Sequence, residues 1–307
     1  MPAESLLIVG SGAMASLYAA RLAAHADVTM LGSWAAGLSA IQKRGVHLEE
    51  DGHLSTVRVR ATAQAAECRG AALALVLVKS FQTEEAAERL AACLAPGGLA
   101  VTLQNGLGNR ERLAARLGAQ RVALGVTTDG ATLLGPGYIR AGGRGTTTLP
   151  EDERCSGLAA LLRRGGFQVA RAPDVDALAW GKAVVSAGIN PLAALLRLPN
   201  GALLEPQREG AWQVAAEAAR ETAAVAGALG LQLPFADPVE RVAEVARATA
   251  ANRSSMLQDI ERGRPTEIDA ICGAIAAEGQ RLGVATPVNR VLWNLVRSLT
   301  PTPGGAA

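Results

Sequence analysis

The spacing of apolar and polar residues differs between the two halves of the chain. In the first half, short and almost wholly apolar runs lie at 5–9, 28–31, 73–78 and 99–103, and helical patterns separate several of them. Continuous apolar runs of this length are typical of strands buried on both faces of a parallel sheet. The same half predicts further strands at 121–128, 138–140 and 146–149, of which the last two are expected to be antiparallel.

From about residue 173 the pattern becomes that of helix after helix. Helices are predicted at 173–190, where Pro191 would end the first of them, at 205–229, at 238–250 and after Pro287. The 307 residues are enough for two domains. We therefore expect an α/β domain at 1–172 followed by an all-helical domain at 173–307.

The composition excludes several classes of protein. Hydrophobic residues make up 49% of the chain and the net charge is +2, which argues against disorder and against electrostatic binding of nucleic acid. The longest apolar strand-like run, 71–78, is far shorter than the ~20 residues of a membrane span, and no signal-peptide pattern is present. Four cysteines without paired spacing are expected to pack as small hydrophobes, namely Cys68, Cys93, Cys155 and Cys272. We expect a cytoplasmic protein without nucleic-acid or membrane partners.

A glycine-rich turn follows the first apolar run. Gly10-Ser11-Gly12-Ala13-Met14-Ala15 matches the G-x-G-x-x-A pattern: the first glycine makes the turn, the second admits a pyrophosphate and the small last residue allows close packing. Free N–H groups at the start of the next helix would receive the phosphates. Between a strand and a helix this pattern favours a dinucleotide site in a Rossmann-type domain, although a tight strand–helix turn uses the same glycines.

The residues after the second strand bear on the choice of dinucleotide. An NAD site usually has an Asp or Glu there, whereas an NADP site often has an Arg nearby. The chain has Gly32-Ser33-Trp34 and neither of those groups, unless Lys43 or Arg44 reaches back. Ser33 could bond a 2′-phosphate, and no carboxylate would repel that phosphate. The sequence therefore favours NADP.

Lysine is rare and stands where chemistry is expected. Only three of the 30 basic residues are lysines: Lys43, Lys79 and Lys182. Unlike an arginine, a buried lysine can lose and regain a proton. Lys79 follows an apolar strand at the edge where parallel sheets bind ligands, a position equally compatible with a solvated lysine. All three histidines lie within the first 53 residues of the chain, so we expect neither a histidine acid or base nor a histidine-bound metal.

One predicted helix carries a polar stripe. Lys182, Ser186 and Asn190 recur every four residues and so share a face of the helix at 173–190. A solvated face would normally contain more Glu, Arg and Gln, so a stripe turned towards a site is favoured. Asn-Gly turns at Asn105 and Asn200 would bring further amides to the site, although both dipeptides are also ordinary turn signals.

Taken in order, these segments resemble the ketopantoate reductase (2-dehydropantoate 2-reductase) family from Gly10 to about Arg297. The most specific stretch is 254–259 with 263–269. The other matching segments are 10–15, 78–79 with 82–83, 104–106, 125–128, 180–182, 189–191 and 199–201. The resemblance implies a Rossmann domain that binds NADPH, joined to a helical domain that carries substrate-binding and catalytic residues.

The resemblance also implies roles for individual residues. Lys182 and Glu267 would be catalytic: Lys182 would protonate the ketone oxygen, and Glu267 would bind a substrate hydroxyl or the nicotinamide ribose. The implied substrate-binding residues are Asn105, Lys182, Ser186, Asn190, Asn200 and Ser255. The implied cofactor-binding residues are Gly10, Ser11, Gly12, Ala13, Met14, Ala15, Ser33, Lys79, Asn105, Ala131 and Glu267. Alternatively, Thr266 and Asp269 form a capping box and Glu267 only complements a helix dipole.

The implied reaction is NADPH-dependent reduction of 2-dehydropantoate to (R)-pantoate, on the route to pantothenate and coenzyme A. Three positions depart from the family pattern: Ser186 replaces a usual Asn, Ser33 a frequent Arg, and Asp129 a frequent His. Ser186 leaves a different small 2-oxo acid open as the substrate, and Ser33 leaves NAD open as the cofactor. A non-catalytic NADP-binding regulatory protein and a homodimer are also compatible with the sequence.

Overall fold

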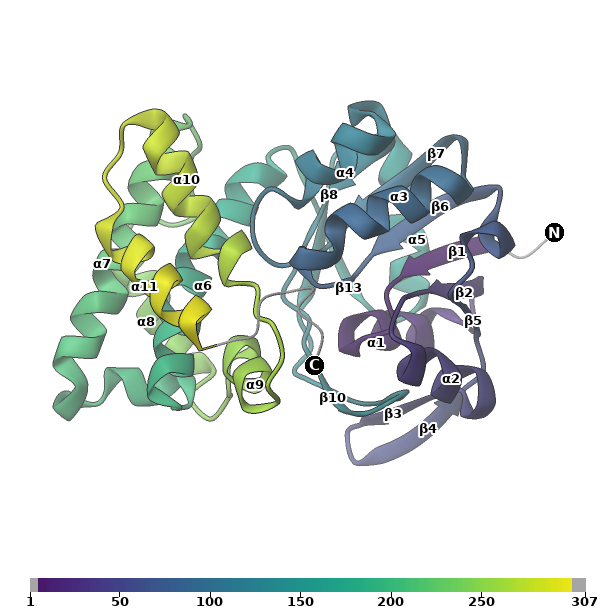
Figure 1. The fold of residues 1–307 in the computed structure, drawn as a ribbon, viewed down its shortest axis with the longest axis horizontal. Helices are drawn as coiled ribbons and strands as arrows, with labels where there is room; N and C mark the ends of the chain where they lie inside the picture. Colours follow the sequence, from purple (N-terminus) through teal and green to yellow (C-terminus); the bar gives the residue numbers. More distant parts are fainter. Residues whose placement is uncertain (1–4, 300–307) are drawn as a thin grey trace. The chain divides into compact units, whose positions relative to one another are not determined.

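The computed structural model describes residues 5–299, which form two compact units (Figure 1). The first unit comprises the chain up to Gln104 together with Asn109–Val175. The second comprises Asn105–Gly108 and the chain from Asp176 onward. The short segment Asn105–Gly108 therefore packs with the second unit, although the residues on both sides of it belong to the first. This places the Asn105 side chain among residues of the second unit.

A six-stranded parallel sheet forms the centre of the first unit. Its strands lie in the order β5 (Arg60–Thr62), β2 (Asp27–Leu31), β1 (Ser5–Val9), β6 (Ala71–Val76), β7 (Leu94–Thr102) and β8 (Val122–Leu124). All neighbouring strands are parallel. Counted along the chain, this is the 3-2-1-4-5-6 order of dinucleotide-binding folds. The prediction of a Rossmann-type parallel sheet is confirmed.

Helices cover both faces of this sheet, which explains why its central strands β1 and β6 are almost wholly apolar. The helices of the unit are α1 (Ala13–Leu22), α2 (Ala35–Arg44), α3 (Thr83–Cys93), α4 (Asn109–Leu117) and α5 (Ser156–Arg164). Leu7 of β1 packs into a cluster with residues of α3 and α4. Its neighbour Ile8 packs on the other side of the strand, into a cluster with residues of α1, α2 and α5. The alternation along β1 thus places one apolar layer on each side.

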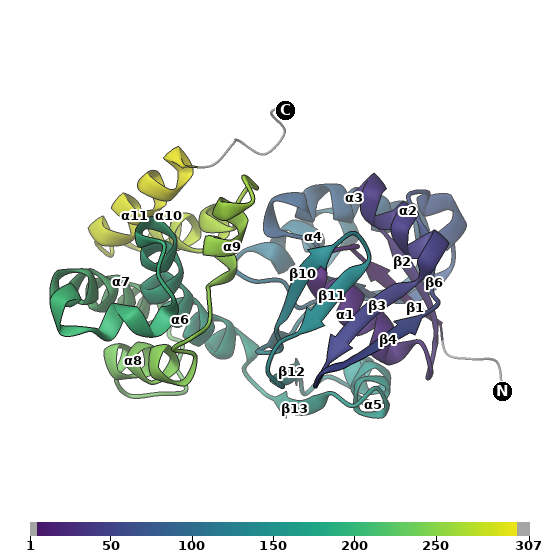
Figure 2. The same cartoon turned by 90° about the horizontal axis from the view of Figure 1, so that it is seen from below.

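Two smaller sheets complete the first unit. One has the order β10 (Ala131–Gly135), β11 (Tyr138–Ala141), β3 (Val46–Glu50) and β4 (His53–Val57), and Figure 2 shows these strands side by side. The other has the order β13 (Gln168–Ala172), β12 (Thr146–Pro150) and β9 (Val126–Thr127). The strands expected at 138–140 and 146–149 exist, but they belong to different sheets, and each has one antiparallel and one parallel neighbour.

The prediction of one strand at 121–128 is wrong, because the chain leaves one sheet and enters another within that range. Val122–Leu124 pairs with β7, whereas Val126–Thr127 pairs with β12. Gly125 lies between the two, and a Cβ there would come within 2.5 Å of Leu103 and 2.9 Å of Leu149. The glycine permits the close approach at which the chain turns from one sheet into the next.

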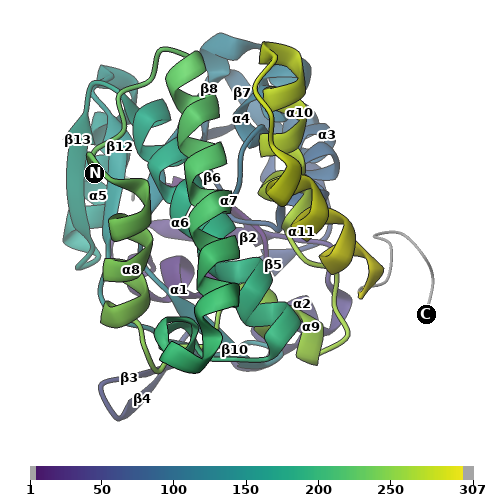
Figure 3. The ribbon, with the colours of Figure 1, turned by 90° about the vertical axis from the view of Figure 1, so that its left-hand side faces the viewer.

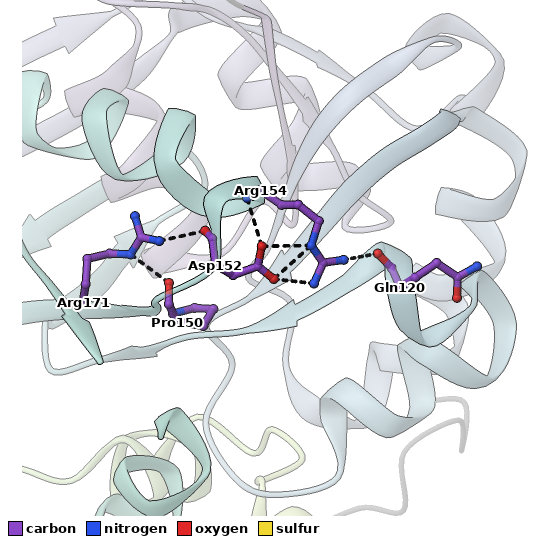
Figure 4. Close-up of polar contacts among 5 residues, drawn as sticks. All are labelled: Gln120, Pro150, Asp152, Arg154 and Arg171. Atoms are coloured by element: carbon purple, nitrogen blue, oxygen red, sulfur yellow. Dashed lines mark hydrogen bonds and ion pairs between the residues drawn. The ribbon is translucent and has the colours of Figure 1, made fainter. Parts of the chain in front are cut away.

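The 3₁₀ turns of the first unit are η1 (Ala65–Cys68), η2 (Ser80–Gln82), η3 (Ala119–Arg121) and η4 (Glu153–Cys155). Two arginines stabilise the chain around η4 (Figure 4). Arg154 bonds the Asp152 carboxylate and the Gln120 carbonyl, and it holds the pKa of the Asp152 carboxyl below its usual value. Arg171 of β13 donates to the Pro150 carbonyl at 2.8 Å and the Asp152 carbonyl at 2.7 Å. The carbonyl of the last residue of β12 and that of Asp152 thereby have guanidinium donors.

The second unit is helical throughout the part of the chain that the structure describes. Its helices are α6 (Val175–Leu196), α7 (Glu209–Ala228), α8 (Pro238–Ala248), α9 (Ser255–Glu261), α10 (Cys272–Leu282) and α11 (Pro287–Ser298). Its 3₁₀ turns are η5 (Asn200–Leu204), η6 (Pro206–Arg208) and η7 (Ile268–Ala270). In Figure 3, α7 lies between α8 and α11. Small residues permit close packing here: a Cβ at Gly188 of α6 would lie 3.0 Å from Val242 of α8.

The expectation that Pro191 ends the first of these helices is wrong. α6 continues to Leu196 with Pro191 inside it. Proline removes one hydrogen bond from a helix, but burial of Leu192, Ala193 and Ala194 favours continuation. The helix ends only where Arg197 adopts a left-handed conformation with φ of 55°.

The added length gives α6 a property that the sequence pattern did not predict. Its 22 residues have a mean hydropathy of 1.2 over an 18-residue window, which is enough by length and composition to cross a membrane. However, 61% of that window is buried inside the protein. A core helix of a folded domain has the same properties, so this feature is weak support for a membrane span.

Other helices differ from the expected ranges at their ends. α7 begins at Glu209 instead of 205, because the residues before it form the turns η5 and η6. α8 begins at Pro238 as predicted, with the Asp237 side chain accepting hydrogen bonds from two N–H groups of its first turn. α10 was not predicted, because Gly273 and Gly279 weaken its helical pattern. A Cβ at Gly273 would lie 3.0 Å from the Trp293 ring, so packing explains that glycine.

A buried polar cluster joins α1 to the strands beside it and gives Asp129 a role. The Tyr18 hydroxyl lies 2.7 Å from Thr147 Oγ1, 3.1 Å from Thr127 Oγ1 and 3.4 Å from Asp129 Oδ2. Asp129 Oδ1 accepts from the Gly145 N–H at 3.1 Å, so the carboxylate joins the segment after β9 to the segment before β12. Burial raises the pKa of the fully buried Tyr18 well above its ordinary value.

Tyr18→Phe is expected to lower the free energy of unfolding by about 1–3 kcal/mol, because buried partners lose a hydrogen bond. Since the folded pKa of Tyr18 is raised, its contribution is fully present below about pH 10 and declines as the pH rises above that value. Denaturant unfolding between pH 7 and 11 should therefore show a shallower alkaline decline in the variant. Tyr138→Phe is the comparison: the hydrogen bond of half-buried Tyr138 to Glu49 at 3.1 Å also raises its pKa, but without the full burial of Tyr18, so the smaller effect is expected there. Equal behaviour of the two variants would contradict the assignment.

Candidate active site

The glycine turn at the end of β1 is shaped to receive a phosphate. Gly10 has φ of 135°, and a Cβ there would lie 3.2 Å from the Ala15 Cβ, so both residues must be small. Gly12 stands at the N-cap of α1, and a Cβ there would meet nothing within 4 Å. No side chain caps the helix and no acidic residue lies in its first turn. Ala13 and Met14 are half-buried in that turn. The first N–H groups of α1 thus suit a dinucleotide phosphate.

The end of β2 lies beside this turn. A Cβ at Gly32 would lie 2.9 Å from Ser11 Oγ, which places the two segments in contact. Ser33 is exposed, and the Gln82 amide lies 3.4 Å from its hydroxyl. Sequence reasoning missed Arg89 of α3, whose guanidinium donates to the Gly32 carbonyl at 3.0 Å and pairs with Glu85. Helical spacing on α3 gave no signal of this long-range contact.

Two further expected cofactor residues, Lys79 and Ala131, lie near strand ends in the first unit. Lys79 is half-buried at the N-cap of η2, just beyond β6. Ala131 begins β10 and packs against the core cluster that contains α1. Of the two cations considered near Ser33, Lys43 is exposed, and Arg44 lies 3.5 Å from the Pro136 carbonyl. Arg44 therefore contacts the loop at Pro136 and not Ser33.

The segment Asn105–Gly108 packs against η7 in the second unit. The Leu107 N–H donates to the Ala270 carbonyl at 2.7 Å. Gly106 has φ of 82°, and a Cβ there would lie 2.7 Å from both the Cβ and the carbonyl oxygen of Ala270. Only glycine fits this conformation and this contact. The Asn-Gly turn signal thus has a specific purpose, which is to hold Asn105 against the turn that follows Glu267.

Lys182, Asn105 and Glu267 form the centre of the candidate site. The Lys182 ammonium donates to Asn105 Oδ1 at 2.7 Å, and Asn105 Nδ2 donates to Glu267 Oε2 at 3.4 Å. Glu267 is 6% exposed, while Lys182 and Asn105 are half-buried. The amide dipole of Asn105 is aligned from cation to anion, which stabilises both charges. An ammonium held in this way can both neutralise and protonate an oxyanion.

Contacts with α11 hold the backbone at Glu267. Asp269, two residues on, accepts a hydrogen bond from the Trp293 indole at 2.6 Å and lies 3.5 Å from Arg297. The Glu267 carbonyl accepts from the N–H groups of Ala270 and Ile271. Sequence reasoning missed Trp293, because a single tryptophan on an amphipathic helix resembles an ordinary core residue.

The capping box expected at Thr266 and Asp269 is wrong. Asp269 bonds Trp293, and Glu267 occupies the N-cap position of η7 without a side-chain cap bond. Thr266 Oγ1 is buried, and no described residue hydrogen-bonds it. The capping-box alternative is therefore wrong, because tertiary contacts override the local capping pattern, and the role of Glu267 stays a prediction.

The polar stripe on α6 is continuous. Lys182, Ser186 and Asn190 are all half-buried, and the helix is unbroken between them. They therefore share one face. The other two expected substrate residues lie elsewhere in the second unit: Asn200 is buried and bonds Thr249, while Ser255 is exposed at the start of α9.

Comparison with known proteins identifies the family. The model of ketopantoate reductase PanE/ApbA matches residues 6–154, and that of its C-terminal domain matches residues 174–300. The chain belongs to the ketopantoate reductase family. It is therefore a dinucleotide-binding oxidoreductase of the ketopantoate reductase type, as the resemblance in its motifs indicated.

Individual relatives agree with this assignment. The 2-dehydropantoate 2-reductase of Archaeoglobus fulgidus is 36% identical over 97% of this chain and 99% of its own length. A PanE/ApbA family ketopantoate reductase from Ralstonia eutropha superposes with a TM-score of 0.89 at 33% identity, covering 96% of this chain and 98% of the other. A D-mandelate dehydrogenase bound to NADH and anilino(oxo)acetate reaches 0.90 at 24% identity over 96% and 97% of the two chains, a likeness of fold alone.

Gly106→Ala is expected to disturb the Asn105–Gly108 segment more than Gly108→Ala does. Both glycines have φ near 80°, so alanine at either costs about 1–2 kcal/mol of backbone strain. Only at Gly106 would the new Cβ also collide with Ala270, whereas at Gly108 it meets nothing within 4 Å. Amide exchange of Leu107 and denaturant unfolding should both show the larger effect at 106. Equal losses would mean that the contact with Ala270 is not tight.

Proposed function

We propose that this chain reduces 2-dehydropantoate to (R)-pantoate with NADPH, in the cytoplasm, on the route to pantothenate and coenzyme A. The observation that carries the proposal is the 2.7 Å hydrogen bond by which Asn105 orients the Lys182 ammonium. The names of relatives such as the Archaeoglobus reductase support the choice of substrate. Residues 1–172 would bind the dinucleotide, and residues 173–307 would carry the catalytic and substrate-binding groups, together with Asn105.

The glycine turn fits the cofactor. Gly10–Ala15 would hold the pyrophosphate at the uncapped start of α1, where open space at Gly12 leaves room for it. Lys79, Ala131 and Asn105 would contact the rest of the dinucleotide. NADPH, when bound, supplies the hydride that reduces C2 of the substrate.

Lys182 is the general acid in this proposal. Negative charge develops on the former carbonyl oxygen as C2 is reduced, and the ammonium at Lys182 stabilises that charge and gives the oxygen its proton. Asn105 keeps the ammonium in place, and Glu267 balances its charge through Asn105. Glu267 also accepts a hydrogen bond from a substrate hydroxyl or from the nicotinamide ribose.

Neutral donors would bind the rest of the substrate. Amides and hydroxyls suit a small hydroxylated anion, and burying them costs less desolvation than burying further charges. The residues proposed for the carboxylate and hydroxyls are Asn105, Ser186, Asn190, Asn200 and Ser255. Ser186 reaches less far than the asparagine that the family pattern has there, which supports a different small 2-oxo acid as the second candidate substrate.

The proposed substrate and cofactor can be tested together by measuring the oxidation of NADPH and of NADH with each of several 2-oxo acids. Ketopantoate with NADPH should give the highest kcat/KM, because Ser33 leaves room for a 2′-phosphate and no acidic residue there repels it. Efficient turnover of another acid beside negligible turnover of ketopantoate would select the second candidate. No turnover of any acid would leave only a non-catalytic nucleotide-binding role.

Lys182→Ala is expected to lower kcat by about 10²–10⁴-fold, because the proton donor is lost. The Kd for NADPH should remain close to that of the parent, since the glycine turn is untouched. Lys43→Ala removes an exposed lysine of α2 and serves as the matched control, with kcat unchanged. A near-normal kcat in Lys182→Ala would remove Lys182 from the acid role.

A further inference from the structure

The loop between α8 and α9 is bonded to the turn at the start of η5. The Asn200 N–H donates to the Asn252 carbonyl at 2.9 Å, and the Gly201 N–H donates to the Ala250 carbonyl at 3.1 Å. The Asn200 side chain adds a third bond, from Nδ2 to Thr249 Oγ1 at 2.9 Å. Three hydrogen bonds from two consecutive residues thus fix one short loop.

The contact between turn and loop is also sterically tight. A Cβ at Gly201 would lie 2.5 Å from the Ala250 Cβ and 2.7 Å from its Cα, so no larger residue fits there without displacing the loop. Asn200 is 8% exposed, and Leu203 in the same turn is fully buried in the core of the unit. The turn is therefore anchored to the core, and the loop is anchored to the turn.

The loop leads directly into α9. Ser254 caps that helix by accepting the Leu257 N–H at 3.1 Å, and it is 6% exposed. Met256 and Leu257 are buried, whereas Ser255 is exposed. Of the two adjacent serines, Ser254 is thus committed to the helix cap, and Ser255 is the one that can meet a ligand.

We propose that Gly201 and Thr249 are positioning residues, which act through the turn at Asn200 and the loop before α9 to set the place of Ser255 for substrate binding. The inference rests on the proposed function, in which Ser255 binds the carboxylate or a hydroxyl of the 2-oxo acid. The three hydrogen bonds among Asn200, Gly201 and the loop 249–252 form a clamp. This clamp fixes the backbone on the N-terminal side of Ser255, and the Ser254 helix cap fixes the start of α9 on the other side. Affinity for the 2-oxo acid should therefore depend on Thr249, even though Thr249 makes no contact with the substrate.

Thr249 allows the clamp to be tested without changing Asn200, which the proposed function also assigns to the substrate. In Thr249→Val the Asn200 amide loses its acceptor, and the hydroxyl bond to the Val245 carbonyl is also lost. Thr222→Val is the matched control: its hydroxyl makes the same kind of bond at 2.7 Å, to Ala218 four residues earlier, but it lies in α7. The difference between the two variants isolates the bond with Asn200.

The expected result is a rise of about 2–10-fold in KM for the 2-oxo acid in Thr249→Val, the effect of one lost hydrogen bond, with kcat and the Kd for NADPH near the parent values. Thr249→Ser keeps the hydroxyl and should restore KM. Thr222→Val should behave as the parent does. If Thr249 acts through Ser255, adding Thr249→Val to Ser255→Ala should raise KM no further. An unchanged KM in Thr249→Val, an equal change in Thr222→Val, or a full further rise in the double variant would overturn the proposal.

Amide hydrogen exchange separates a failure of this inference from a failure of the proposed function. The N–H groups of Asn200 and Gly201 should exchange about 2–10-fold faster in Thr249→Val than in Thr222→Val, whether or not a substrate is known. Unchanged exchange in an enzyme that turns over a 2-oxo acid overturns the clamp alone. If the parent protein turns over no 2-oxo acid, the proposed function fails, and the role of Ser255 in substrate binding fails with it.

Discussion

The hydrogen bond between the Lys182 ammonium and the Asn105 amide is the interaction on which the candidate chemistry depends. It joins segments 77 residues apart in the chain, and a second bond from Asn105 extends it to Glu267. The long lysine side chain can place its ammonium in many positions, so a lysine that donates a proton needs a hydrogen-bond acceptor that holds the ammonium in one of them. Asn105 can be that acceptor only because Gly106 and Leu107 pack its segment against Ala270.

The two units offer a ligand different chemical groups. The first offers backbone N–H groups at the uncapped start of α1, which suit an anion without requiring a charged side chain. The second offers one ammonium, one carboxylate and several neutral donors on helices packed through alanine and glycine. Small residues bring those helices close together, and closely packed helices hold side chains in defined orientations. The aromatic content of only 3% is therefore compatible with a rigid site.

Several tertiary contacts explain residues whose purpose was unclear in sequence. Asp129, which departs from the family pattern, joins the segment after β9 to the segment before β12 and bonds Tyr18 and Thr147. Asp269 is the acceptor for the Trp293 indole and not part of a capping box. Arg89 reaches the Gly32 carbonyl from α3, beside Ser33, where the family pattern frequently has an arginine. In each case the partner lies far away in sequence, so local spacing carried no information about it.

The sequence by itself determined the parallel α/β architecture, the dinucleotide turn and the polar stripe of α6, because each depends on residues within one turn or one element. The tertiary structure alone decided that Pro191 lies inside a helix, that 121–128 divides between two sheets, and that Asn105 meets Lys182 and Glu267. Burial and long-range hydrogen bonds outweigh local preference at those positions. Neither effect can be read from the spacing of residues along the chain.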